Sequence, residues 1–317
     1  MTIEELKDGT SVESSFAVKW KQVFHKKNGE PYLRVVLCDK TGEMPAIAWE
    51  YKPSYDHIKV DGVCKIKGTV GKYNDKLQIT LANVEIVKDE DIDPSLFIKV
   101  GSVGSDVLSA EIDSVMESVT NEHLKLLAFS FFSEPNFREK FLKHPAARSI
   151  HHSYSGGLAE HTLAVCRTCS YLSGQYPLDR DMLLTSALLH DMGKLRELKS
   201  ALAVNYTDEG RLLGHITIGI GMLEDKMKQF SDFPYELAVQ LKHIILSHHG
   251  ELEFGSPVRP MTIEALALHY ADNLDAKLWS FKDWIDSKPD SNDPRWTQYW
   301  PAMERFVFRN NSGSDNS

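Results

Sequence analysis

The sequence predicts a multi-domain α+β protein in which a small N-terminal β-barrel precedes an all-α domain. Three observations predict this fold class. Short runs of alternating apolar and polar residues fill residues 12–88, helical periodicity replaces the alternation from residue 106 onward, and the stretch between them has linker composition. A chain of 317 residues, of which 42% are hydrophobic and 26% charged, is long enough to bury two cores.

The barrel is predicted from five strands that are separated by turn signals. Strands are expected over residues 15–24, 32–37, 44–49, 63–72 and 77–87, where apolar side chains recur at every second position. Asn28-Gly29 between the first two strands has the composition of a hairpin turn. Five short strands with a longer irregular piece after the third fit a closed barrel of the OB type over residues 1–88.

One face of the predicted barrel carries basic and aromatic side chains. Positive charge suits a nucleic-acid backbone and flat rings suit its bases, so this face is a candidate site for a single strand. The candidate residues are Lys19, Trp20, Lys21, Tyr32, Arg34, Lys65, Lys67 and Tyr73. The barrel by itself leaves an alternative open, in which the basic residues only solvate the outer surface and the rings join the core.

The charge balance changes at the linker, which is predicted over residues 89–105. Residues 1–88 hold 14 Lys and Arg against 12 Asp and Glu, which leaves 22 against 33 for residues 89–317. The net charge of −9 argues against unspecific binding of nucleic acid or anionic membrane by the whole surface. No apolar run approaches the roughly 20 residues of a membrane span, and four scattered cysteines suit a reducing compartment, so we expect a cytoplasmic protein without a membrane partner.

The all-α domain is predicted over residues 106–309, and a disordered polar tail over 310–317. Apolar stripes at helical spacing occupy residues 107–142, and no strand signal returns after residue 106. Further helices are expected over about 158–174, 179–190, 213–230, 235–248 and 261–286. The pair Cys166 and Cys169 lacks a partner pair for a zinc site, so packing within a helix is its expected role.

Histidines and aspartates recur along these helices in an order that suits a metal site. Any single histidine is more often a core or surface residue than a ligand, and the chain has 13 of them. The adjacent pair His190-Asp191 stands out, because an apolar helix runs into it and a glycine follows at Gly193. The full set of candidate ligands is His161, His190, Asp191, His215, His248, His249 and Asp272.

Imidazole and carboxylate ligands together suit Mn, Fe, Co, Ni or Zn better than Mg or Ca. The number of candidates predicts two ions, one held by His161, His190, Asp191 and Asp272 and the other by His215, His248 and His249, with Asp191 as the bridge. Two ions about 3.5–4 Å apart activate a hydroxide and neutralise phosphoryl oxygens, which fits hydrolysis of a phosphate ester.

Several residues near the candidate ligands in the sequence are expected to contact the substrate or to support the ligands. Lys194 lies one helical turn beyond His190, where it can contact a substrate phosphate, so Asp191 and Lys194 are the candidate catalytic residues. Asp275 competes with Asp272 for the ligand role, and His269, one turn before Asp272, is a candidate supporting residue. His151 and His152 are candidates to line the pocket.

Four motifs resemble those of the HD superfamily of metal-dependent phosphohydrolases. In order they are Gly156-Gly157-Leu158-Ala159-Glu160-His161-Thr162, Leu188-Leu189-His190-Asp191-Met192-Gly193-Lys194, Gly214-His215-Ile216 and Ala271-Asp272. With the barrel in front, nearly the whole chain resembles the YhaM family of bacterial 3′→5′ exoribonucleases. This resemblance implies an OB-fold joined to an HD domain, and manganese-dependent release of nucleoside monophosphates from a single-stranded 3′ end.

The expected function is therefore a metal-dependent 3′→5′ exoribonuclease that hydrolyses single-stranded RNA to nucleoside 5′-monophosphates by a metal-activated hydroxide. Two alternatives from other classes remain, a small-nucleotide phosphohydrolase whose barrel serves assembly and a nucleic-acid-binding regulator with an inactive site. The second is disfavoured because every ligand position holds a residue that can bind a metal. The sequence leaves open whether single-stranded DNA is also a substrate, which metal is loaded, and whether the chain forms a homo-oligomer.

Overall fold

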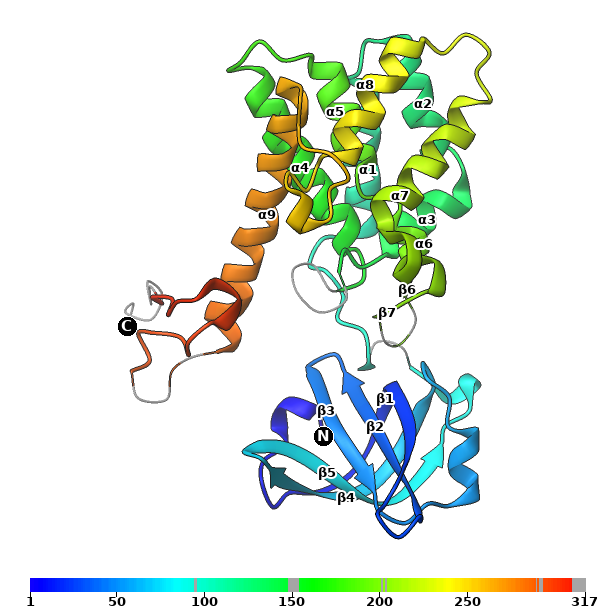
Figure 1. Cartoon of the computed structure of the whole chain (residues 1–317), viewed down its shortest axis with the longest axis vertical. Coiled ribbons are helices and arrows are strands. Elements are labelled where there is room, and N and C mark those ends of the chain that lie inside the picture. The colour runs from blue at the N-terminus through cyan, green and yellow to red at the C-terminus, as the bar shows by residue number, and fades with distance from the viewer. Residues whose placement is uncertain are drawn as a thin grey trace. The chain divides into compact units, whose positions relative to one another are not determined.

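The computed structural model describes residues 1–93, 96–147, 154–200, 202, 204–288, 290 and 293–309. The chain forms two compact units, one made of Met1–Ser102 with Leu198–Thr207 and the other of Val103–Glu197 with Asp208–Ser317. Figure 1 shows a barrel in the first unit and a helical bundle in the second, which confirms the predicted fold class. His151, His152 and the tail 310–317 lie outside the described residues.

The first unit is a closed barrel with the strand order β1-β2-β3-β5-β4. Its strands are β1 (Ser11–His25), β2 (Pro31–Asp39), β3 (Gly42–Ala48), β4 (Val63–Tyr73) and β5 (Lys76–Ile86). The long strand β1 closes the barrel, because its first half pairs with β4 and its second half with β2. A register shift between Val18 and Trp20 lets β1 bend from one partner to the other. Phe16, Leu33 and Ile66 fill the interior and are fully buried.

Short 3-10 helices complete this unit at η1 (Ile3–Glu5), η2 (Pro53–His57) and η3 (Asp89–Asp91). The helix η2 occupies the irregular piece that the sequence places after the third strand, and its Tyr55 is buried against the barrel core. In the stretch expected to be a linker, Phe97 is buried in a small cluster with Ala17, Cys38 and Val63.

The second unit is a helical bundle. Except for α6 and α7, its helices lie within a few residues of the predicted ranges. The helices are α1 (Ser105–Glu117), α2 (Glu122–Phe132), α3 (Pro135–Lys143), α4 (Gly157–Ser173), α5 (Arg180–Leu189), α6 (Lys194–Glu197), α7 (Asp208–Met227), α8 (Tyr235–Leu246) and α9 (Ile263–Ser287). The one-turn helix α6 is not among the predicted elements, and α7 begins earlier than expected. Short 3-10 helices follow at η5 (Leu252–Phe254) and η6 (Pro301–Met303).

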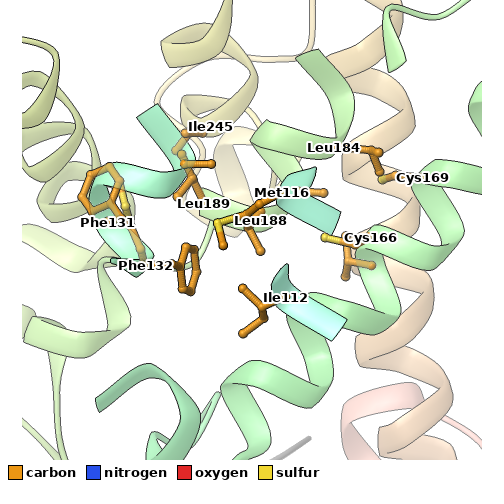
Figure 2. Close-up of a cluster of buried hydrophobic side chains, with 14 of the residues drawn as sticks. Ile112, Met116, Phe131, Phe132, Cys166, Cys169, Leu184, Leu188, Leu189 and Ile245 are labelled. Carbon is orange, nitrogen blue, oxygen red and sulfur yellow. The ribbon is translucent and has the colours of Figure 1, made fainter. Parts of the chain in front are cut away.

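Helix α5 is the centre of the bundle and leads directly into the His190-Asp191 pair. Every residue from Met182 to Leu189 is buried, because α5 packs against α2, α4, α8 and α9 on all sides. Figure 2 shows part of this core, where Leu188 and Leu189 of α5 lie among Met116, Phe132 and other apolar side chains. Cys166 and Cys169 are free thiols within the same core, as their expected packing role requires. A helix buried all round delivers its C-terminal residues to the protein interior.

A two-stranded hairpin contradicts the expectation that no strand follows residue 106. Strands β6 (Leu198–Ser200) and β7 (Val204–Tyr206) pair antiparallel between α6 and α7, and both belong to the compact unit of the barrel. Strands of three residues are too short to give a periodic signal in the sequence. Among the helices of the described residues, none combines the length and apolarity that crossing a membrane requires.

Candidate metal centre

The bundle brings all the predicted metal ligands to one place. His161 comes from α4, His190 and Asp191 follow α5, and His215 lies in α7. His248 and His249 follow α8, and Asp272 lies on α9. The ligand atoms of His161, His190 and Asp272 all lie within 4.8 Å of one another, and so do those of His215, His248 and His249. Apart from Asp191, which groups with His190 and His248 instead, these groups are the two sets that the sequence assigns to two ions.

Asp191 lies between the two groups and directs one oxygen toward each. Its Oδ2 is 3.5 Å from Nε2 of His161 and 3.4 Å from Nε2 of His190. Its Oδ1 is 3.4 Å from Nε2 of His215 and 3.8 Å from Nε2 of His248. Two ligands bound to one ion at about 2.0–2.2 Å are themselves separated by ~3–3.5 Å. The carboxylate therefore has the placement of a bridging ligand.

Each histidine of the centre holds its Nδ1 away from the metal position. Backbone carbonyls accept from Nδ1 of His190 (Ala187, 2.8 Å), His248 (Ile245, 2.7 Å) and His249 (Phe254, 2.8 Å). A carbonyl only accepts hydrogen bonds, so Nδ1 carries the proton and Nε2 keeps its lone pair. This fixes both the tautomer and the ring orientation that metal ligation needs.

Carboxylates orient the two remaining histidines. Asp275 Oδ2 lies 2.6 Å from Nδ1 of His161, on the opposite side of the ring from Asp272. Asp275 therefore orients His161, and Asp272 lies on the ligand side. Glu197 Oε1 accepts from the backbone N–H of His215 at 3.0 Å and lies 3.1 Å from its Nδ1. Sequence reasoning missed Glu197, since it belongs to no motif and lies 18 residues from His215.

The donor atoms fit a divalent transition metal. Nε2 of His190, His215 and His248 and Oδ1 of Asp191 are buried and make no hydrogen bond among the described residues. A buried polar atom without a partner costs about 1–3 kcal/mol, so several converging on one point require an explanation. Imidazole nitrogens with carboxylate oxygens are the ligands that Mn, Fe, Co, Ni and Zn accept.

The surroundings favour the neutral form of His248 and the charged forms of Asp191 and Asp272. Burial, and then the neighbouring His249 and His190, lower the pKa of His248 well below its usual value. Burial raises the pKa of Asp191, but Lys194 and His190 outweigh that effect and bring the pKa well below its usual value. Burial likewise raises the pKa of Asp272, and its contact with His161 more than reverses the change. Neutral imidazoles and ionised carboxylates are the ligating forms.

Two glycines shape the backbone at the centre, Gly193 by allowing a close approach and Gly214 by its positive φ. A Cβ on Gly193 would lie 2.0 Å from the carbonyl oxygen of His215 and 2.7 Å from the amide nitrogen of Gly219. The turn after Asp191 and helix α7 are therefore in backbone contact. Gly214 has φ 70° and ψ 155°, which interrupts α7 directly before His215. The backbone N–H of His215 can then reach the Glu197 carboxylate.

Two further residues near the centre have defined positions. Lys194, the second candidate catalytic residue, is buried and its Nζ donates to Asp191 Oδ2 at 2.6 Å. Burial lowers the pKa of Lys194, but the Asp191 carboxylate outweighs this and raises it above its usual value. His269 Nδ1 donates to the carbonyl of His248 at 2.9 Å, so it supports the segment that carries two ligands.

On the barrel, four aromatic rings form a continuous row on β1, β2 and the residue after β3. Trp20 lies against Phe24 (6.3 Å between ring centroids), Phe24 against Tyr32 (5.7 Å) and Tyr32 against Trp49 (5.4 Å). The guanidinium of Arg34 lies 5.4 Å from the Phe24 centroid. Trp20 and Trp49 are 39% and 49% exposed. Phe24 and Trp49 are not among the predicted binding residues, although the strand register pairs Phe24 directly with Tyr32.

The other predicted binding residues do not join this aromatic row. Lys19 is 6% exposed and pairs with Glu43, and the Lys21 amine donates to the carbonyls of Tyr55 (2.6 Å), Asp56 and Ile58. Lys65 and Lys67 on β4 both pair with Glu13, at 3.3 and 3.2 Å. Tyr73 lies at the end of β4 and is 68% exposed.

Comparison with protein families assigns both parts of the chain. Residues 158–277 match the model of the HD domain, and residues 20–87 match a model described as an OB-fold nucleic acid binding domain. Two curated relatives carry the name 3′-5′ exoribonuclease YhaM. The one from a Geobacillus species is 34% identical over 79% of this chain and 78% of its own length, and that from Bacillus velezensis is 32% identical over 85% and 86%.

Among solved structures, the second OB-fold domain of replication protein A from Methanococcus maripaludis is 21% identical. The match covers 29% of this chain and 98% of that domain, with a TM-score of 0.24. The fold assignment of the barrel rests on its own strand order and not on this slight likeness.

Proposed function

This chain belongs to the YhaM family of 3′-5′ exoribonucleases, and we propose that it hydrolyses single-stranded RNA from the 3′ end to nucleoside 5′-monophosphates. Its HD domain makes it a hydrolase of phosphodiester bonds. The observation that carries the finer proposal is the position of Asp191, whose two oxygens face two separate groups of ligands.

The proposed centre binds two divalent ions, with manganese as the first candidate and Fe, Co, Ni or Zn as the others. His161, His190 and Asp272 would hold one ion, His215, His248 and His249 the other, and Asp191 both. Such ions supply an activated water and neutralise charge on phosphoryl oxygens. The protein's own part is to fix the imidazoles through Nδ1, to keep the ligands out of bulk water, and to place the Lys194 cation beside Asp191.

The aromatic row on the barrel supports a single strand as the substrate. Rings with exposed faces stack on bases of any sequence, which a nuclease without sequence preference requires. Arg34, which is exposed on β2 beside the row, supplies a positive charge for the backbone. The exposed Lys65 and Lys67 remain proposed phosphate contacts, because their pairing with Glu13 at the surface contributes little and is easily exchanged for a phosphate. We give Lys19 and Lys21 a role within the barrel instead, since their amines are engaged there.

Incubation with a 5′-labelled oligoribonucleotide tests the proposal. With manganese we expect a ladder of products that shorten from the 3′ end, and with a chelator we expect none. The same oligomer in DNA form tests whether single-stranded DNA is also a substrate. No ladder on RNA together with release of phosphate from mononucleotides would instead establish a small-nucleotide phosphohydrolase.

A further inference from the structure

The candidate metal centre is partly open to solvent, and the opening lies at His215, His249 and Asp272. These three candidate ligands are partly exposed, whereas the other candidate ligands are buried. The rings of His215 and His249 lie close together, with 5.0 Å between their centroids. A phosphate that reaches the metal positions from solvent therefore approaches over these partly exposed ligands, and the sugar and base attached to it must lie just outside them.

An aromatic side chain, that of Phe254, lies beside this opening. Phe254 is the last residue of η5, which follows the His248-His249 pair, and its carbonyl accepts from Nδ1 of His249 at 2.8 Å. Its ring begins only a few bonds from that carbonyl oxygen, so the near edge of the ring lies within ~8 Å of Nδ1 of His249. The sugar and base of one nucleotide span a distance of this size. Phe254 is therefore within reach of a base whose phosphate lies at the metal position.

The turn that carries Phe254 holds its ring at the surface. The ring is 63% exposed, and no other aromatic ring of the described residues pairs with it. The backbone is fixed, since the N–H of Phe254 donates to the carbonyl of Glu251 at 3.1 Å. The N–H of Gly255 donates to the carbonyl of Leu252 at 3.1 Å, and Gly255 ends the turn with φ 93°, a left-handed conformation that glycine adopts without strain. Exposed rings are common, but this one has a fixed place next to a metal ligand.

The charges next to Phe254 favour a neutral ligand group. Glu251 and Glu253 belong to the same turn; Glu253 is exposed, and Oε2 of Glu251 lies 2.8 Å from Nε of Arg259. Carboxylates at this place repel a phosphate group, so the backbone of a strand is not expected here. A nucleobase is uncharged and stacks on an aromatic ring through its flat face. The phosphate therefore belongs at the metal positions and the base at Phe254.

We propose that Phe254 binds the base of the 3′-terminal nucleotide by stacking, while the phosphate of that nucleotide lies at the metal centre. The inference deepens the proposed exonuclease function and rests on it. Because every base has a flat face, stacking holds a nucleotide in place without selecting its sequence. The carbonyl of the same residue orients His249, so one turn positions both a metal ligand and the substrate.

The test measures binding and needs no turnover. Adenosine 5′-monophosphate and ribose 5-phosphate share a phosphate and differ in the base, so each is titrated by calorimetry into the full-length protein with manganese. Phe254→Ala removes the ring but keeps the backbone carbonyl that His249 needs, and Phe254→Trp offers a larger ring. Tyr235→Ala is the matched control, because Tyr235 is a 79% exposed ring at the start of α8, whose length of ~18 Å separates it from His248. Manganese binding is measured for every variant.

We expect the unaltered protein and Tyr235→Ala to bind adenosine 5′-monophosphate about 5- to 150-fold more tightly than ribose 5-phosphate. Phe254→Ala should lose this preference while its affinities for ribose 5-phosphate and manganese stay the same, and Phe254→Trp should keep it. A preference that survives in Phe254→Ala, or a loss of manganese binding in that variant, would refute the stacking role. If the unaltered protein hydrolysed RNA but showed no preference, only this inference would fail, whereas absence of RNA hydrolysis with manganese would overturn the proposed function itself.

Discussion

Asp191 is the residue on which both halves of the metal centre depend, because each of its oxygens faces a different group of histidines. Asp191→Asn replaces one carboxylate oxygen by an NH2 group, which cannot bind a cation, and removes the negative charge. We expect the rate of RNA hydrolysis to fall below about 1% and bound manganese to fall with it, while the fold persists. Metal analysis and a kinetic assay measure both quantities. Asp225→Asn, an equivalent change on the outer side of α7, is the control, and full metal content with substantial activity in Asp191→Asn would contradict the two-ion assignment.

Glu197 acts on the same centre indirectly, because its carboxylate contacts the candidate ligand His215 and not the metal position. Glu197→Ala removes the acceptor for the backbone N–H and Nδ1 of His215, so the ring loses its fixed orientation. We expect manganese affinity or activity to fall by about 10- to 100-fold. Glu197→Gln keeps an oxygen at the same place and should recover most of that loss. Equal defects in the two variants would mean that the charge and not the orientation matters.

The candidate metal ligands could be predicted from sequence because they lie in short motifs or adjacent pairs on predicted helices or at their ends. Their supports could not all be predicted, since a supporting hydrogen bond depends on the packing of segments that are distant in the chain. Asp275 and Asp272 are rivals in the sequence because both fall on one face of a helix, and only the two sides of the His161 ring separate their roles. The fixing carbonyls of Ala187, Ile245 and Phe254 leave no trace in the sequence at all.

At the scale of elements, the contact between the turn after Asp191 and helix α7 depends on Gly193. Alanine there would place its Cβ 2.0 Å from the His215 carbonyl oxygen, so the two segments must separate. We expect Gly193→Ala to lower stability by about 1–3 kcal/mol and to weaken manganese binding. Gly221→Ala in the same helix meets nothing within 4 Å and should be neutral or stabilising by up to ~1 kcal/mol. Thermal unfolding of the two variants, compared side by side, checks this, and equal melting temperatures would contradict it.

The aromatic row on the barrel is a second element with a measurable role. Tyr32 is at its centre, between Phe24 and Trp49. Tyr32→Ala should weaken binding of single-stranded RNA by about 1–3 kcal/mol, the contribution of one stacked base, with little effect on hydrolysis of a dinucleotide. Tyr171→Ala, on α4, removes another exposed ring and is the control for the Tyr32 variant.

Removing Lys65 and Lys67 should instead reduce the salt dependence of RNA binding, by ~0.7 in the log–log slope for each phosphate that the protein no longer neutralises.

At the scale of the whole molecule, the order of a barrel followed by a bundle could be predicted because the hydrophobic period changes once along the chain. The hairpin of β6 and β7 could not, because its order comes from contacts with the barrel and not from its own sequence. The strand register likewise decides which rings meet. Lys19 precedes Trp20 in the chain, but its side chain is buried beside Glu43 and does not join the aromatic row. This burial coincides with the register shift between Val18 and Trp20.

At the scale of the whole molecule, the proposed direction of hydrolysis depends on which end of the strand enters the metal centre. Attack of water on the terminal phosphodiester, with the 3′ oxygen of the preceding residue as leaving group, gives a nucleoside 5′-monophosphate and a new 3′ hydroxyl on the shortened chain. A 3′ phosphate should therefore slow the first step, because it adds bulk and negative charge beside Asp191 and Asp272, whose pKa values are both held below their usual range. Chromatography of the products, with a circular RNA as a substrate without ends, checks this polarity. Nucleoside 3′-monophosphates, or cleavage of the circle, would contradict it.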